Sequence, residues 1–296
     1  MSTCNREHWL DEYEWRPHWP WEVELTICIA AACIEDGDIN KRRIVQCTDS
    51  LVSNALGSAE TMMKQTPIGH NFQMLPSGTA PEASAMRRLL KKHFGSAEGI
   101  DETNVLVLVK SAIHERKREI VESFVQNRYA LSYDELIRFG KEKIPIEQFN
   151  NTFIKISGLT PEIEFLVTGF DQYGQPIIIV AGRGEEPFIT EGFGVVGSGL
   201  YLASSALLQR EVDYIWPLNK TVYAVWEAKK YAERVKTVGK ATTLTYRGPG
   251  GLAKILHPTG TMAIRDHYNN YGPKDLLEDL ELPEDAFDEL GSIDKA

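Results

Sequence analysis

The chain has few cysteines, and all of them lie near its beginning. Cys4, Cys28, Cys33 and Cys47 are the only four in 296 residues, and none lies beyond Cys47. Disulfide-stabilised domains need cysteines spread along the chain, so this distribution excludes a disulfide framework. We therefore expect free thiols in a reducing compartment and a fold that is stabilised by its apolar core.

Long apolar runs and an excess of basic residues are also missing. No stretch reaches the roughly 18 apolar residues of a membrane span, and the first 24 residues lack the basic-then-apolar order of a signal peptide. Lys and Arg number 32 against 42 Asp and Glu, which disfavours binding to phosphates through a broad basic surface. We expect a cytoplasmic protein with protein or peptide partners, no nucleic acid and no membrane.

Histidines at metal-ligand spacing and internal repeats are absent as well. The seven histidines are scattered, without a close pair of the kind that binds zinc. His257 and His267 lie ten residues apart in a glycine-containing segment that we expect to be a structural loop. We expect no metal and no cofactor, and the lack of a repeating period excludes a solenoid.

The sequence does contain an ordered series of strand and helix patterns. Apolar, β-branched runs bounded by turn residues predict two strands at 25–34 and 44–50, joined by a charged loop at 35–43. They also predict a strand pair at 68–78, a hairpin of 162–171 with 175–184, and a strand at 240–248. Amphipathic spacing predicts helices at 80–95, in most of 103–143, and at 200–211 and 218–235. This order favours two antiparallel sheets stacked between two helical layers, while leaving other α+β folds open.

Both ends of the chain differ in composition from its middle. Residues 1–24 are rich in aromatic side chains, and this extension either packs its rings on the domain or a neighbouring subunit, or is a removable propeptide. Its aromatic positions include Trp9, Tyr13, Trp15, Trp19 and Trp21. Residues 266–296 form an acidic tail that we expect to be solvated or to dock on a partner, which leaves 25–265 as the folded domain.

Three motifs follow one another along this domain. The opening strand, LTICIAAAC, has Thr26 as its second residue. Asp49 ends the second strand, Lys64 follows 15 residues later, and Gly78 lies 14 residues beyond Lys64. Ser198 lies in the glycine-serine-glycine turn of GVVGSGLYLASSALL. Taken singly, such residues are usually packed, capping or solvated, so the inference depends on their combination and order.

In this order, the motifs resemble the proteasome β-type and HslV-like family of N-terminal nucleophile hydrolases. The resemblance covers roughly Leu25 to Gly248. It implies a four-layer αββα sandwich, in which two antiparallel sheets lie between helical layers. It also implies self-association into rings or another homo-oligomer, and a threonine-type peptidase that acts on peptides or proteins in a self-compartmentalising assembly.

The resemblance assigns a role to each residue. Thr26 would become the new N-terminus, and its hydroxyl would attack a peptide carbonyl while its freed amino group accepts the proton. Lys64 would stay charged beside this nucleophile, held and oriented by Asp49. Ser198 would lie beside the nucleophile, and an amide near Gly78 would donate to the oxyanion.

The chain departs from the family pattern in several places. The family cleaves its propeptide after glycine, but Leu25 precedes Thr26, so self-cleavage should be hindered. A shift of one residue would put Leu25 itself at the nucleophile position, which would make the subunit inert. Many members carry an Asp and a Ser near the end of the fourth helix, where this chain has Val235 and Val238, and the helical excursion at 130–150 has no counterpart.

Two further interpretations stay open. One is a non-catalytic ring or scaffold subunit that keeps the fold for assembly and uses its terminal segments for docking. The other is a small-molecule amidohydrolase with Cys28 or Cys33 as nucleophile, although cysteines in an apolar strand usually only pack. A free Thr26 amine would distinguish the peptidase from the scaffold, which would retain its N-terminal extension.

Overall fold

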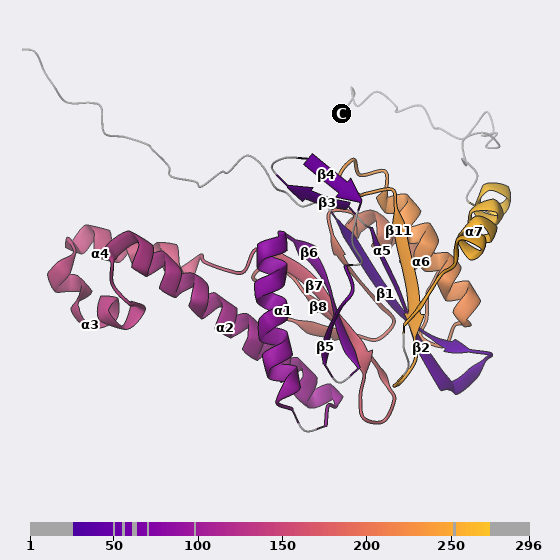
Figure 1. Ribbon diagram of the computed structural model, residues 1–296, viewed down its shortest axis with the longest axis horizontal. Coiled ribbons are helices and arrows are strands. Elements are labelled where there is room, and N and C mark those ends of the chain that lie inside the picture. Colours follow the sequence, from indigo (N-terminus) through magenta and orange to yellow (C-terminus); the bar gives the residue numbers. More distant parts are fainter. Residues whose placement is uncertain are drawn as a thin grey trace, which may run out of the picture.

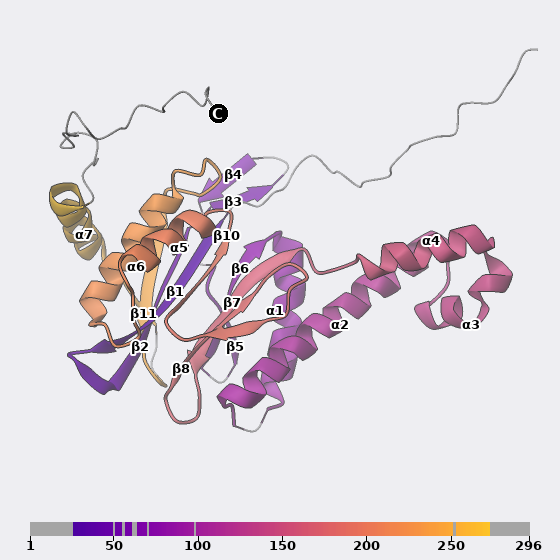
Figure 2. The same ribbon diagram turned by 180° about the vertical axis from the view of Figure 1, so that it is seen from behind.

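The computed structural model describes most of the chain between residues 26 and 272. The described residues are 26–49, 51–54, 57–60, 64–69, 71–97, 99–250 and 253–272. They form an α+β fold in which two five-stranded antiparallel sheets are flanked by helices (Figure 1, Figure 2). The expected N-terminal extension and residues 273–296 of the expected acidic tail lie outside the described residues.

The first sheet is built around β1, which is buried along almost its whole length. β1 pairs with β10 on one side and with β2 on the other, and β11 and β12 continue the sheet beyond β2. The uncharged run predicted a buried strand at this place, which is confirmed. The strands are β1 Ile27–Glu35, β2 Asp38–Asp49, β10 Phe193–Gly197, β11 Thr242–Arg247 and β12 Lys254–Ile255.

The connection between β1 and β2 is shorter than the sequence pattern predicted. Asp36 and Gly37 make a two-residue turn with φ of +55° and +71°, which is the conformation of a tight hairpin turn. β2 therefore begins at Asp38, and its charged first half is the more exposed part of the strand. The predicted loop at 35–43 is therefore wrong beyond Gly37, because an exposed strand end tolerates charged side chains as well as a loop does.

The second sheet has the strand order β5–β6–β7–β8–β9, with every neighbouring pair antiparallel. The hairpin of β7 and β8 and the strand pair of β5 and β6 are both as the sequence predicted. The strands are β5 Thr66–Gly69, β6 Phe72–Gly78, β7 Ile163–Phe170, β8 Pro176–Ala181 and β9 Phe188–Thr190. A separate two-stranded sheet of β3 Leu51–Asn54 and β4 Gly57–Glu60 was not predicted.

Helices cover the outer face of each sheet. On the second sheet, the apolar sides of α1 and α2 share one cluster with β6, β7 and β8. On the first sheet, α5 and α6 share a cluster with β1, β2 and β10 (Figure 1, Figure 2). These helices are α1 Ala80–Gly95, α2 Glu102–Tyr129, α5 Leu200–Gln209 and α6 Leu218–Ala232.

A further helix, α7 Pro258–Tyr271, replaces the loop expected between His257 and His267. The loop prediction was wrong because His257 caps this helix: its side chain accepts a hydrogen bond from the Thr259 amide, and Pro258 follows in the first turn. The ring of Tyr268 packs edge-on against Trp226 of α6, with 5.3 Å between centroids. The helix also passes residue 265, so its last turns occupy the start of the expected tail.

The two sheets meet through a third apolar cluster that is built on small side chains of β1. Cys28, Ala30 and Ala32 face the second sheet, where Leu166 and Ile178 are among their partners. Beside this cluster lies a buried polar network. Gln46 of the first sheet donates to the hydroxyl of Thr168 in the second, and Thr245 donates to Gln65 over 2.9 Å. The sheets are thus joined by both apolar packing and hydrogen bonds.

The second half of α2 extends away from the sheets and carries two short helices. Together, residues 117–158 form what we call the helical arm, with α3 Tyr133–Lys143 and α4 Ile146–Ser157 (Figure 1). The arm has a core of its own, consisting of Val121, Val125, Leu131, Leu136, Ile144, Phe149 and Ile156. The helical excursion predicted at 130–150 is therefore confirmed, and α4 extends it to residue 157.

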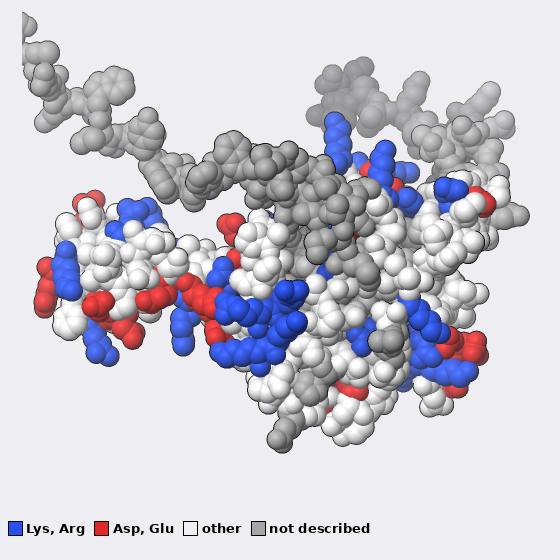
Figure 3. All heavy atoms as spheres, viewed as in Figure 1, with Lys and Arg blue, Asp and Glu red and all other residues white. Residues whose placement is uncertain are grey.

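Ion pairs join α1 to α2 at the surface. Arg116 contacts Glu82 over 2.7 Å, and Lys92 contacts Glu115 over 2.6 Å. Figure 3 shows the basic side chains gathered over α1 beside acidic ones along α2. Among the described residues, no helix is both long and apolar enough to cross a membrane.

Replacing Phe165 with alanine tests the importance of the core between the second sheet and its helices. Phe165 is 1% exposed, and its loss should lower the free energy of unfolding by about 3–5 kcal/mol, because the removed ring leaves a cavity. Phe188→Ala is the control, since this ring is 50% exposed and its loss should cost less than about 1 kcal/mol. Urea denaturation measures both values, and equal losses would contradict the packing described.

Candidate active site

Thr26 is held firmly at the point where the chain enters β1. It is 3% exposed, and its backbone carbonyl accepts a hydrogen bond of 3.0 Å from the amide of Ser198. Gly197, at the end of β10, has φ of +106°, and a Cβ atom there would overlap the Thr26 carbonyl oxygen. Only glycine lets β10 come this close, so the glycine of the predicted turn positions the backbone of Thr26.

Asp49, at the end of β2, is the acceptor on which several segments converge. It is 0% exposed, and its Oδ1 accepts hydrogen bonds from the Thr26 hydroxyl and from Lys64, the latter over 2.8 Å. The amide of Ile27 also lies 3.4 Å from Oδ1, while Oδ2 accepts from the amide of Gly239 over 2.9 Å. A carboxylate without solvent contact needs such partners, and here the donors come from three separate parts of the chain.

Lys64 completes a triangle with Thr26 and Asp49. Its ammonium donates both to Asp49 and to the Thr26 hydroxyl, which in turn donates to Asp49. The Lys64 side chain is 12% exposed and that of Asp49 is 0% exposed, so this ion pair is largely buried and salt screens it little. The hydroxyl oxygen therefore faces a positive charge that would stabilise negative charge developing on it. The structure thus brings together three of the five residues predicted from the sequence, which we call the Thr26 cluster.

The other two predicted residues do not belong to this cluster through their side chains. Ser198 binds Thr26 through its backbone amide, and the residue itself is exposed. Gly78 ends β6 with φ of +152°, and its nearest neighbours are in the β7 region, where it pairs with Ile163. Ser77, which the sequence did not single out, is 3% exposed and has its Oγ 3.0 Å from the Cβ position of Gly197.

The contribution of Gly239 was also missed, because a backbone amide leaves no trace in a side-chain pattern. Gly239 follows α6, directly after the stretch that contains Val235 and Val238. Val238 is 5% exposed, and both Val235 and Val238 pack in the core of the first sheet. Val238 also lies 3.1 Å from the Cβ position of Gly199. The valines therefore fix the loop that carries the Gly239 amide.

The cysteines are poorly suited to act as nucleophiles. Burial raises the pKa of Cys33 and of Cys47 to about 12, and burial also raises the pKa of Cys28 well above its usual range. The Cys28 thiol donates to the Pro76 carbonyl over 3.4 Å. Because the thiolate is the reactive form, these neutral buried thiols disfavour the amidohydrolase interpretation.

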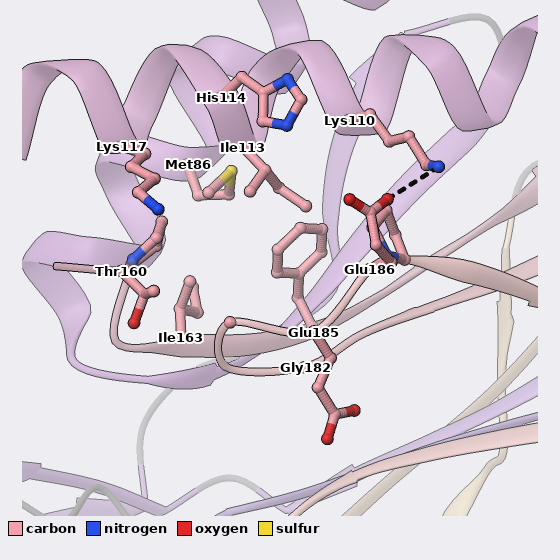
Figure 4. A pocket seen from close by; sticks show the side chains of 14 residues that line it. Met86, Lys110, Ile113, His114, Lys117, Thr160, Ile163, Gly182, Glu185 and Glu186 are labelled. Atoms are coloured by element: carbon pink, nitrogen blue, oxygen red, sulfur yellow. Dashed lines mark ion pairs between the residues drawn. The ribbon is translucent and has the colours of Figure 1, made fainter. Parts of the chain in front are cut away.

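A separate pocket lies on the helical side of the second sheet, between α2 and the strands below it. Its volume is about 140 Å³, and Met86, Ile113, Ile163 and Phe165 form part of its apolar lining. Figure 4 shows His114 and Lys117 at the helix side, and the ion pair of 2.8 Å between Lys110 and Glu186 at one end. None of the residues predicted from the sequence lines this pocket, so it is distinct from the Thr26 cluster.

Comparison of the sequence with protein-family models finds no match, and a search of curated proteins finds none either. Within the described part of the chain, no group of three or more His, Cys, Asp or Glu side chains is arranged to hold a metal ion. The geometry of the Thr26 cluster is therefore the basis for a functional proposal.

Replacing Gly197 with alanine tests whether the close approach of β10 positions Thr26. The added Cβ would overlap the Thr26 carbonyl in a backbone conformation that alanine disfavours, so we expect a loss of about 3 kcal/mol or more in unfolding free energy. Gly37→Ala is the control: it has φ of +71° but no atom within 4 Å of its Cβ position. It should cost about 1–2 kcal/mol from backbone strain alone, and equal losses in urea denaturation would show that the contact with Thr26 is unimportant.

Proposed function

We propose that the chain is a threonine-type peptidase of the proteasome-like N-terminal nucleophile hydrolases, acting in a self-compartmentalising homo-oligomer. The observation that carries the proposal is the Thr26 hydroxyl, held between the carboxylate of Asp49 and the ammonium of Lys64 at the start of β1. A threonine at the start of a strand can pack without an ion pair against its hydroxyl. A buried pair that converges on its hydroxyl is the arrangement expected of an activated nucleophile.

The arrangement of the sheets supports the finer assignment of the fold. Two antiparallel sheets face each other across the cluster of Cys28, Ala30 and Ala32, and pairs of helices cover their outer faces. The proposed four-layer αββα sandwich has this order of layers. Its nucleophile is expected at the start of a central strand, which is where Thr26 lies relative to β1.

The proposed reaction begins when residues 1–25 are removed. In the uncleaved chain, the nitrogen of Thr26 is a peptide nitrogen and cannot accept a proton. Once freed, the amino group takes the hydroxyl proton as the Thr26 oxygen attacks the substrate carbonyl. Lys64 stabilises the charge that develops on this oxygen, and Asp49 keeps Lys64 in position.

The second half of the proposed reaction reverses these proton movements. The ammonium of Thr26 gives its proton to the leaving amine, the peptide bond breaks, and an ester remains on the Thr26 oxygen. Water then attacks this ester, the amino group accepts a proton from the water, and the carboxylic acid product leaves as the hydroxyl is restored. Thr26 is thereby regenerated, and the net change is hydrolysis of one peptide bond.

The alternative is a non-catalytic ring or scaffold subunit, and two observations favour it. Leu25 precedes Thr26, and its side chain would hinder the self-cleavage that frees the amine. The helical arm also presents apolar side chains to solvent, as expected of an assembly surface. The most exposed are Ile137 at 49%, Phe139 at 46%, Ile146 at 60% and Ile154 at 70%.

Intact-mass spectrometry of the natively expressed full chain separates these two functions. The peptidase requires a mature chain that begins at Thr26, because only then is its amine free. A mass that still includes residues 1–25 would exclude the N-terminal nucleophile mechanism and favour the scaffold. A Thr26→Ala variant is the control, since it should keep the extension if removal is self-catalysed.

Replacing Thr26 with alanine should abolish peptide hydrolysis. We expect a loss of more than about 10³-fold in kcat, because the attacking atom is gone, while Thr26→Ser should retain activity. Thr242→Ala is the matched control, because Thr242 pairs with Asp49 in the β-ladder but its hydroxyl lies outside the Thr26 cluster. Cleavage of fluorogenic peptides measures all three variants, and a fully active Thr26→Ala variant would rule the proposal out.

A further inference from the structure

Lys229 is a buried charge that the proposed mechanism does not use. It lies on the inner side of α6 among Val225, Ala228 and Ala232, and it is 0% exposed. Lysine is almost never fully buried unless it is paired, because its ammonium loses its hydration. This desolvation lowers the pKa of Lys229, while the neighbouring carboxylate of Glu233 acts in the opposite direction. A cation at this position therefore needs polar partners that compensate for its lost hydration.

The ammonium of Lys229 is occupied by the loop that follows α6. It donates to the carbonyl of Gly239 over 2.6 Å, to the carbonyl of Lys240 over 3.0 Å, and to Glu233. These three acceptors match the three donors of a lysine. Lys229 thus binds two consecutive carbonyls of one short loop.

The same loop carries the amide that reaches the Thr26 cluster. Gly239 accepts from Lys229 with its carbonyl and donates to Oδ2 of Asp49 with its amide, over 2.9 Å. Asp49 in turn binds Thr26 and Lys64 through Oδ1. A continuous chain of hydrogen bonds therefore runs from Lys229 through one residue of the loop to the hydroxyl of Thr26.

We propose that Lys229 is a positioning residue, which sets the Gly239 amide against Asp49 and thereby orients the Thr26 cluster. The catalytic meaning of this role rests on the proposed peptidase function, whereas the geometric role does not. Lys229 touches neither the substrate nor the hydroxyl of Thr26. It acts through Gly239 and Asp49.

Packing alone does not require a lysine at this position. A methionine of similar length could fill the same space among the apolar side chains, and buried ion pairs can often be replaced by apolar residues without loss of stability. An apolar side chain cannot hold the carbonyls of Gly239 and Lys240. The Lys240 carbonyl also lies 3.4 Å from the Thr242 hydroxyl, whereas the Thr237 hydroxyl in the same loop is buried without a hydrogen-bond partner among the described residues.

Lys230 offers a matched control on the next position of α6. Its ammonium also binds Glu233, at 2.7 Å and 3.0 Å, and its side chain is 26% exposed. Among the described residues, its hydrogen bonds are to Glu233 and not to the carbonyls of Gly239 or Lys240. Lys230→Met therefore removes the same charge from the same helix and the same partner, without touching Gly239.

The decisive measurement is the amide resonance of Gly239 in the full chain labelled with ¹⁵N-glycine. An amide that donates to a carboxylate is shifted downfield, so Asp49→Asn gives the reference for a weakened bond. In Lys229→Met, we expect the resonance to move toward its position in Asp49→Asn, while Lys230→Met leaves it at the wild-type position. An unmoved Gly239 resonance in folded Lys229→Met would overturn the proposal.

A second variant covers the case in which Lys229→Met does not fold. Glu233→Gln keeps Lys229 but removes the charge that helps to orient it, so the Gly239 resonance should move in the same direction by a smaller amount. The shift of the Gly239 resonance in Glu233→Gln is compared with the shift in Lys230→Met. If Lys229→Met does not fold and the Glu233→Gln shift is no larger than that of Lys230→Met, the proposal is overturned.

Peptide hydrolysis provides the catalytic readout. If the wild-type protein is active, Lys229→Met should lower kcat by about 10–100-fold with KM unchanged, because misplacing the reacting groups affects the chemical step. Lys230→Met should keep wild-type kcat, and a wild-type kcat in Lys229→Met would overturn the catalytic part. An inactive wild-type protein would instead reject the proposed function, while the Gly239 resonance would still decide the geometric role.

Discussion

The buried carboxylate of Asp49 is the constraint on which the rest of this site depends. A charge without solvent contact must be matched by donors, and each donor fixes the segment that supplies it. Thr26 and Ile27 come from the entrance to β1, Lys64 from the chain before β5, and Gly239 from the loop after α6. One carboxylate therefore aligns three parts of the chain that are far apart in sequence, and it does so where the two sheets come together.

Small residues make this convergence possible. Gly197 lets β10 approach the Thr26 carbonyl, and Gly199 leaves room for Ala232, whose Cβ lies 2.6 Å from the position that a Cβ of Gly199 would occupy. Along β1, alanines rather than larger residues face the second sheet. The buried ion pair and the hydroxyl thus depend on glycines, which have no side chain, as much as on the side chains that form the site.

Much of the fold could be predicted from the sequence, because its strands and helices have strong periodic patterns. The apolar run of β1 and the threonine-rich β11 are examples. The resemblance of the ordered motifs to a known family, rather than the residues taken singly, predicted that Thr26, Asp49 and Lys64 lie together. What could not be predicted depended on tertiary context. The start of α7 resembles a loop in sequence because its proline and its glycine are also turn residues, and the Gly239 amide carries no side-chain signal. Lys229 had a detectable signal, since it occupies an apolar stripe of α6 with Val225, Ala228 and Ala232, but two of its three partners are backbone carbonyls of the following loop.

Helix α2 belongs to two cores at once. Its first half packs through Val105, Val109 and Ala112 on the second sheet, and its second half packs through Val121 and Val125 within the helical arm. A single continuous rod of 28 residues therefore joins a large core to a small one. Because the two halves of α2 pack in different cores, opening of the arm would leave the contacts of the first half with the second sheet in place. Loss of the core beneath the first half of α2, in contrast, would free one end of the helix on which the arm is built.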